Sequence, residues 1–228
     1  WYAQVQAGDQ VVTAAVRYSM ILARQGKVDD ARNYLRNVQT QNPQQQILLV
    51  QAEAQVLREA KRYTEAFDLL TAELEAHPAQ PELLYDLAMI AERLDRLDVL
   101  ETRLKQLIAI KPDHAQAYNA LGYTLADRNL RLGEAREYIQ KALSMSPDDA
   151  FILDSMGWVE FRLGNLDGAH EHLSRAYSIR QDPEIAAHLG EVLWERGDRA
   201  GAERIWAESR TKHPANAELE AVMAKFLK

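Results

Sequence analysis

The 228-residue sequence contains no cysteine, which removes disulfide bonds, thiol nucleophiles and thiolate metal sites together. This absence does not fix the compartment, because proteins without disulfides work in the cytosol and in the periplasm. No apolar run approaches the roughly 20 residues that a membrane-spanning helix needs. The sequence also lacks H-E-x-x-H, G-x-S-x-G and a glycine-rich phosphate loop, so three common catalytic patterns are missing.

The charge balance argues against nucleic acid as a partner. With 27 Lys and Arg against 34 Asp and Glu, the formal net charge is −7, which is poorly suited to a phosphate backbone. His170 and His172 stand two residues apart on a helix, point to different faces and cannot share a metal ion. We find no set of nucleophile, base and orienting group, and we therefore expect no enzyme, no cofactor and no metal site.

The spacing of the prolines indicates an internal repeat. Six of them stand at positions 43, 78, 112, 147, 183 and 214, a spacing close to 34 residues over most of the chain. A period of about 34 residues is that of tetratricopeptide repeats (TPRs), each a pair of antiparallel helices. The sequence thus resembles an all-α TPR protein, and the resemblance implies a right-handed solenoid with an inner and an outer wall.

The period divides the chain into about six repeats and a terminal helix. The predicted repeats span residues 12–46, 47–80, 81–114, 115–149, 150–182 and 183–216, and residues 217–228 form a capping helix. Leu219, Val222, Met223, Phe226 and Leu227 make the apolar stripe of that cap. Residues 1–11 fall where the second helix of an upstream, truncated repeat belongs.

Gly157 occupies the middle of an apolar helical run, where glycine weakens a helix by roughly 1 kcal/mol relative to alanine. Its position in the repeat faces Ala169 of the following helix, and we expect the two small residues to let the helix backbones approach closely. Gly164 then allows the tight turn between the helices.

In repeat 81–114, Leu100 and Leu107 replace the expected small residues, which predicts a wider or shifted helix pair. Repeat 115–149 carries one extra residue before Ala135.

The first helices of a TPR solenoid line its inner wall, and this resemblance assigns the candidate binding residues. They are Tyr85, Arg93, Asn119, Tyr123, Phe151, Asp154, Trp158, Phe161, Arg162, His188, Glu191 and Trp194. We call Tyr123, Trp158, Phe161 and Trp194 the aromatic band. We expect a protein or peptide partner in the concave groove to contact this band, because Tyr, Trp and Arg most often carry binding energy at interfaces. On this reading, Trp158→Ala combined with Trp194→Ala weakens binding and leaves melting nearly intact.

Two further points concern the function of the inner-wall residues. The aromatic side chains can instead pack between neighbouring first helices, which would make them structural. The Lys/Asn/Asn/Lys/Arg set by which chaperone-binding TPR proteins hold a carboxylate is missing, since Ala126 and Asp127 stand where basic residues belong.

Three stretches carry a more specific resemblance: ALGYTLADRNLRLGEA (120–135), ILDSMGWVEFRLGNLDGA (152–169) and AAHLGEVLWERGDRAGAERIW (186–206). They resemble the C-terminal half of bacterial TPR lipoproteins that act as adaptors for a periplasmic C-terminal processing protease. The resemblance implies a periplasmic scaffold, tethered to the outer membrane by an N-terminal lipid, that docks the protease and delivers cell-wall hydrolases. Such a scaffold raises the effective concentration of one partner near the other.

Other assignments stay open at this stage. The chain also suits a TPR subunit of an envelope or secretion assembly, the TPR region of an enzyme with an upstream catalytic domain, or a cytoplasmic protein. Because the sequence starts at Trp1 within a repeat, we expect a longer parent protein with its natural C-terminus retained. We also expect self-association through the truncated N-terminal face, which light scattering would detect.

Overall fold

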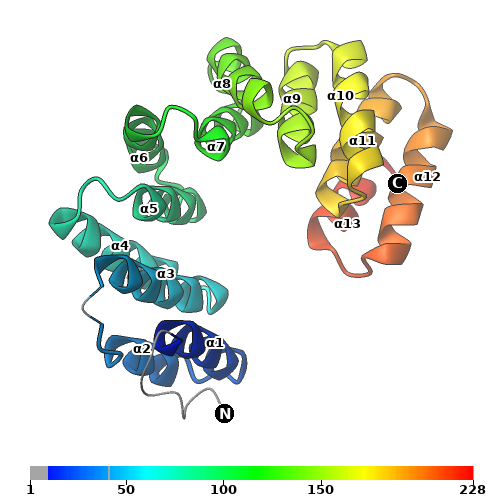
Figure 1. Cartoon of the computed structure of the whole chain (residues 1–228). Coiled ribbons are helices and arrows are strands. Elements are labelled where there is room, and N and C mark those ends of the chain that lie inside the picture. The colour runs from blue at the N-terminus through cyan, green and yellow to red at the C-terminus, as the bar shows by residue number, and fades with distance from the viewer. Residues whose placement is uncertain (1–9, 41, 228) are drawn as a thin grey trace. The chain divides into compact units, whose positions relative to one another are not determined.

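All regular structure in the described part of the chain is α-helical. The computed structural model describes residues 10–40 and 42–227 (Figure 1). Its helices are α1 (Val11–Arg24), α2 (Val28–Arg36), α3 (Pro43–Glu59), α4 (Tyr63–Ala76), α5 (Pro81–Arg93), α6 (Leu97–Ile110), α7 (Ala115–Asp127), α8 (Leu132–Met145), α9 (Ala150–Arg162), α10 (Leu166–Ile179), α11 (Pro183–Glu195), α12 (Arg199–Lys212) and α13 (Ala217–Phe226). None of these helices combines the length and apolar content that crossing a bilayer requires. The predicted all-α fold is confirmed.

The chain divides into two compact units. Unit 1 spans residues 1–112 and contains α1–α6, and unit 2 spans residues 113–228 and contains α7–α13. Within them, consecutive helices contact each other as pairs, beginning with α1 and α2 and ending with α11 and α12. Each unit is therefore a stack of helix pairs.

The helix pairs fall within the predicted repeats, with two shifts at the N-terminal side. α1 begins at Val11, one residue ahead of the boundary at 12, and α3 begins at Pro43, four residues ahead of the boundary at 47. Pro43 occupies the first turn of α3, where its missing N–H costs nothing, so it opens a helix instead of closing a repeat. The predicted helix over residues 1–11 lies mostly outside the described residues, and Val11 itself belongs to α1.

Gly157 brings α9 close to α10, in agreement with the sequence-based prediction. A Cβ at this position would lie 2.5 Å from Leu173 Cγ and 3.1 Å from the carbonyl oxygen of Ala169. Ala169 and Leu173 are both buried, so the space is already filled. Dispersion attraction along this seam offsets the low helix propensity of glycine.

The turn between these helices requires a left-handed residue. Gly164 has φ +83°, and the next amide, of Asn165, donates to the carbonyl of Glu160 at 2.9 Å. The same bond pattern closes two turns of unit 1 that lack glycine, where Lys61 (φ 58°) and Asp95 (φ 57°) hold the left-handed position. The turn geometry therefore repeats even where glycine is absent, at a cost of about 1 kcal/mol per residue.

Two predicted departures from the repeat have visible consequences. Leu100 and Leu107 are fully buried, so the larger side chains fill the space beside α5. Whether this pair is wider than the others stays a prediction. The extra residue before Ala135 makes Arg131 the N-cap of α8 in a left-handed conformation, with φ 45°.

Helix α13 covers the end of unit 2 as the predicted cap. Leu219 and Met223 are buried against α11, and the Phe226 ring lies 5.6 Å from the Trp206 ring. Leu227 belongs to the predicted apolar stripe, but it follows the helix end and is exposed. The stripe is therefore one residue shorter than its sequence pattern.

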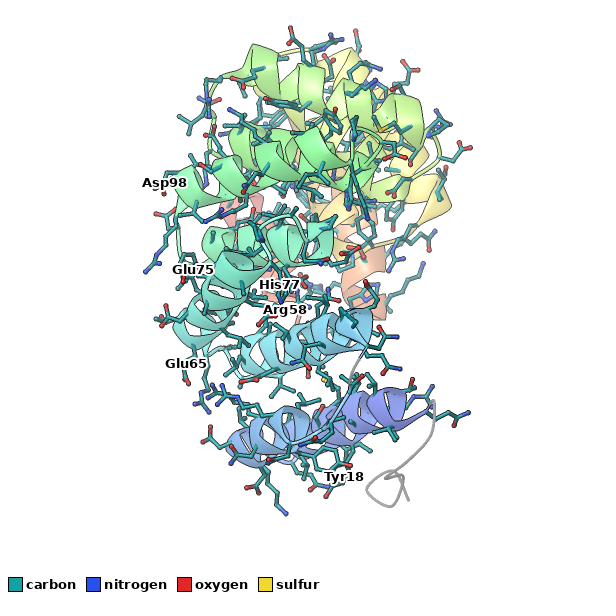
Figure 2. All side chains as sticks on the ribbon, turned by 60° about the vertical axis from the view of Figure 1, so that its left-hand side comes forward. Tyr18, Arg58, Glu65, Glu75, His77 and Asp98 are labelled. Carbon is teal, nitrogen blue, oxygen red and sulfur yellow. The ribbon has the colours of Figure 1, made fainter. Side chains whose placement is uncertain are left out.

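A buried charge joins the first two helix pairs of unit 1. The Glu53 carboxylate on α3 accepts from Arg32 Nε at 3.0 Å and from Arg36 Nη2 at 2.6 Å, both on α2. Arg32 also bonds Glu65 of α4, which is labelled in Figure 2. Two guanidinium groups satisfy the buried carboxylate here, where the neighbouring repeat has the apolar Leu87.

Candidate functional site on the inner faces

In both units the first helices of the pairs define an inner face. α1 contacts α3 and α3 contacts α5 in unit 1, while α7, α9, α11 and α13 contact in series in unit 2. Among the described residues, second helices of neighbouring pairs make no comparable contacts. Each stack therefore bends toward its first helices, which places the predicted inner-wall positions on the concave side of each unit.

Unit 1 carries an open groove on this inner face, which we call the unit 1 groove. Its volume is about 500 Å³. The apolar lining comes from α1 and α3, and the polar lining also includes α5. The lining residues are Val12, Thr13, Val16, Arg17, Met20, Leu48, Gln51, Ala52, Gln55 and Asp86. Leu48 is 45% exposed, so a large apolar side chain faces solvent beside a concave surface.

The polar end of the unit 1 groove is formed by an amide and a carboxylate. Gln51 Nε2 donates to Asp86 Oδ2 at 2.8 Å, across from α3 to α5. Burial raises the pKa of Asp86, and the Gln51 hydrogen bond and the charge of Arg58 oppose that rise. Asp86 thus presents a poorly compensated carboxylate at the end of an apolar surface.

The predicted site residues are split between the two units. Tyr85 and Arg93 lie on α5 of unit 1, Tyr85 half-buried and Arg93 exposed, and neither lines the unit 1 groove. Burial raises the pKa of the Tyr85 hydroxyl. The other ten residues lie on α7, α9 and α11 of unit 2.

In unit 2 the centre of the predicted set is a buried ion pair. His188 Nδ1 on α11 lies 3.0 and 3.1 Å from the two carboxylate oxygens of Asp154 on α9. Trp158 is 6% exposed and stacks on the His188 ring, with ring centroids 4.1 Å apart. The Phe161 ring also stacks on the indole, with the centroids 5.2 Å apart. These side chains fill the space between α9 and α11.

A hydrogen bond spans two repeats on the inner side of unit 2. Tyr123 Oη on α7 donates to Glu184 Oε1 on α11 at 2.9 Å. Burial raises the pKa of Glu184, and nearby Asp154 adds to that effect while the Tyr123 hydrogen bond opposes it. Because α7 and α11 are joined across α9, the inner side of unit 2 is closed by its own side chains here.

Trp194 belongs to the seam beneath the cap. Its ring lies 5.9 Å from Trp206 of α12 and 5.5 Å from Phe226 of α13. Beside it, the buried carboxylate of Glu191 accepts from Lys225 Nζ of α13 at 2.6 Å. Trp194 and Glu191 thus attach α13 to α11.

The rim of this inner face is more accessible. Phe151 is 41% exposed, with the Arg180 guanidinium 4.9 Å above its ring. Arg162 lies 5.6 Å from the Trp158 ring and donates to the carbonyl of Asp127 at 3.2 Å. Asn119 is buried, and its Oδ1 has no hydrogen-bond partner among the described residues.

The aromatic band does not lie open as a single surface. Trp158 is buried, and Tyr123, Phe161 and Trp194 are partly buried in ring contacts or hydrogen bonds within unit 2. Asp154, Trp158, His188 and Glu191 are buried, because neighbouring first helices approach closely enough for these side chains to contact each other or α13. Their role in binding a partner stays a prediction. Whether Phe151, Arg162 or Asn119 contacts a partner stays a prediction.

Sequence reasoning does not select the unit 1 groove. Four inner-wall positions near this groove carry no aromatic residue: Val16, Met20, Gln51 and Gln55. A choice of binding residues that favours aromatic side chains therefore does not include them. Leu48 gives the available signal, because it follows the buried Ile47 and precedes the buried Leu49 at a position the repeat does not require to be apolar. Within residues 10–40 and 42–227, no three His, Cys, Asp or Glu side chains gather to hold a metal ion.

Comparison with known proteins identifies the family to which this helical architecture belongs. A model of the tetratricopeptide repeat family matches residues 18–81 and 85–150, more than half of the chain. The chain belongs to the tetratricopeptide repeat family. TPR proteins bind protein partners, and no catalytic family is indicated for this TPR chain.

The chain is similar to one relative in sequence and to solved TPR structures in fold. A TPR repeat-containing protein of Pseudomonas aeruginosa, PA4667, is 42% identical over 190 residues, which cover 83% of this chain and 32% of that protein. This TPR chain therefore spans about a third of its relative's length. The thermophilic TPR protein TTC0263 of Thermus thermophilus matches with a TM-score of 0.68 at 26% identity, over 76% of this chain and 95% of that one.

The pilus biogenesis factor PilW matches with a TM-score of 0.73 at 17% identity, over 95% of this chain and 100% of that one. At this identity the likeness concerns the fold alone.

Proposed function

We propose that this TPR chain is a non-catalytic scaffold that holds client polypeptides for a C-terminal processing protease of the periplasm. The clients are cell-wall hydrolases, and the full-length parent is tethered to the outer membrane by an N-terminal lipid. The unit 1 groove and the rim around Phe151 offer surfaces for these partners.

The unit 1 groove is the observation that carries the scaffold role. Its apolar surface, with Leu48 exposed at the edge, is unfavourable in water, and covering it with another apolar side chain lowers the free energy. Gln51, Gln55 and Asp86 add hydrogen-bonding groups to the lining of the groove. Apolar contact with a few polar groups is what recognition of an extended polypeptide requires.

The proposed protease partner and the periplasmic location rest on the resemblance carried by residues 120–135, 152–169 and 186–206. An adaptor needs no chemistry of its own, because holding two partners on one scaffold raises their effective concentration to the millimolar range. A lipid-modified cysteine at the start of the parent protein would support the location. An upstream nucleotide-sugar domain would contradict it and favour the enzyme alternative.

Reconstituted proteolysis tests the proposal. The full-length parent, the purified protease and a purified cell-wall hydrolase are mixed, and the rate of hydrolase loss is followed with and without the parent. We expect the parent to stimulate degradation, and we expect Met20→Ser combined with Leu48→Ser to reduce the stimulation about tenfold. Ile110→Ser is the matched control, because Ile110 is 42% exposed at the end of α6 and outside the unit 1 groove.

The outcomes separate two claims. No stimulation by the parent protein contradicts the adaptor role. Stimulation that survives Met20→Ser with Leu48→Ser, or falls equally with Ile110→Ser, contradicts the assignment of the unit 1 groove as the client surface.

A further inference from the structure

Asp86 has an unusual position for a carboxylate. It lines the unit 1 groove and also the adjoining smaller recess formed with Ala54, Arg58 and Ile90. It therefore stands where the apolar surface from α1 and α3 meets the polar edge contributed by α5. A ligand that covers the apolar lining of the unit 1 groove therefore lies beside Asp86.

Within the described residues, the Asp86 carboxylate forms no ion pair. Its one hydrogen bond comes from the neutral amide of Gln51, at 2.8 Å to Oδ2. The cation that opposes the rise of its pKa, Arg58, is exposed and donates its own hydrogen bond to Gln55. Arg17 also lines the unit 1 groove but already has a contact of its own. By contrast, Glu53, the buried carboxylate of the same helix stack, is paired with two guanidinium groups.

A half-buried carboxylate beside an apolar surface favours a particular ligand chemistry. Burial weakens its hydration and strengthens its attraction for a cation, because the local dielectric constant is lower than in water. An acidic ligand is repelled at the same place, and a purely apolar one leaves the carboxylate without a counter-charge.

We propose that the unit 1 groove recognises a polypeptide segment in which a large apolar residue stands next to Lys or Arg. The apolar side chain covers Val16, Met20 and Leu48, and the cationic group pairs with Asp86. This inference rests on the proposed function and adds the chemistry of the client segment to it.

Three synthetic peptides test the preference directly. All share a Gly/Ser backbone of about twelve residues and differ at two central positions, which are Leu-Lys, Leu-Glu or Ser-Lys. Binding to the isotopically labelled chain is followed through the amide resonances of Leu48, Ala52 and Asp86. We expect the Leu-Lys peptide to bind about tenfold more tightly than either of the others, a difference typical of one charge pair or one buried side chain.

Variants assign the preference to its residue. Asp86→Asn keeps the acceptor for Gln51 and removes the charge, and we expect it to abolish the difference between the Leu-Lys and Leu-Glu peptides. Asp68→Asn is the matched control, because Asp68 lies on α4 of the same unit and does not line the unit 1 groove.

Equal binding of the three peptides, absence of binding, or a preference that Asp86→Asn retains would overturn the inference. If hydrolase degradation still depends on Leu48 in those cases, the proposed function stands and only the client chemistry is wrong. If the Leu-Lys peptide binds through Asp86 but the parent protein stimulates no degradation, the proposed function fails instead. Self-association that disappears with Asp86→Asn would identify a second copy as the occupant and overturn the inference as well.

Discussion

His188 and Asp154 form a buried ion pair between α11 and α9, with Nδ1 of the imidazole 3.0 Å from one carboxylate oxygen and 3.1 Å from the other. Burial by itself lowers the pKa of His188, but Asp154, supported by Glu184 and Glu218, raises it to about 9. The histidine is therefore charged in the folded protein at neutral pH, and one aromatic face is covered by Trp158.

The raised pKa predicts how stability depends on pH. Because the folded pKa is about 9 and the unfolded value is 6.5, the ion pair contributes fully below about pH 6.5 and is lost as the pH rises through 9. We expect His188→Gln to lower the free energy of unfolding by roughly 3 kcal/mol at about pH 6, because it leaves Asp154 buried without a counter-charge. Urea unfolding at about pH 6 and about pH 10 measures this, and a difference between wild type and variant that does not shrink at the higher pH would contradict the ion-pair account.

Gly157→Leu is predicted to disrupt the contact between α9 and α10. Its Cβ alone would lie 2.5 Å from Leu173 Cγ and 3.1 Å from a backbone oxygen, and the backbone cannot move aside cheaply. We expect a loss of about 3 kcal/mol in the free energy of unfolding, at the upper end of the range for overpacking. Gly133→Ala is the control, because nothing lies within 4 Å of a Cβ there and Gly133 is in α8. Equal unfolding midpoints for the two variants would remove the close-approach explanation.

Trp158→Ala is predicted to destabilise the protein. This replaces the sequence-based expectation that Trp158→Ala combined with Trp194→Ala leaves melting nearly intact. The side chain is 6% exposed and contacts His188 and Phe161, so its removal leaves a cavity worth about 3 kcal/mol or more. Phe151→Ala is the comparison, since Phe151 is 41% exposed and we expect a change below about 1 kcal/mol. Thermal melting distinguishes them, and a Trp158→Ala variant that melts like Phe151→Ala would show that the indole is not part of the core.

Asp86→Asn is predicted to stabilise unit 1 slightly at neutral pH. Burial raises the pKa of Asp86, which means that the folded state disfavours its charge, and asparagine removes that penalty while it keeps the Gln51 hydrogen bond. We expect a gain of up to about 1 kcal/mol at about pH 7 that disappears at low pH, where Asp86 is itself protonated. Chemical unfolding at about pH 7 and about pH 3 measures the gain, and a clear loss of stability at neutral pH would indicate that the carboxylate is already well paired.

The repeat itself is predictable from sequence because its determinants are local. The contacts of Gly157 with Ala169 and of Gly164 within its turn involve residues less than one repeat apart, and a spacing of about 34 residues reproduces them along the chain. The helix pairs of the described residues follow from that pattern, and so does the role of Leu219 and Met223 in the cap.

The availability of the inner face is not predictable in the same way. Tyr123 and Glu184 are 61 positions apart and meet only because α7, α9 and α11 approach one another on the inner side of unit 2. The unit 1 groove stays open because the inner positions of α1 and α3 carry Val16, Ala52 and Gln51, whose side chains do not fill the space between the helices. The sequence by itself determined which residues form each helix pair, since that depends on contacts within one repeat. The tertiary structure alone decided which inner residues remain accessible, since that depends on how closely successive pairs approach and on the volume of every side chain between them.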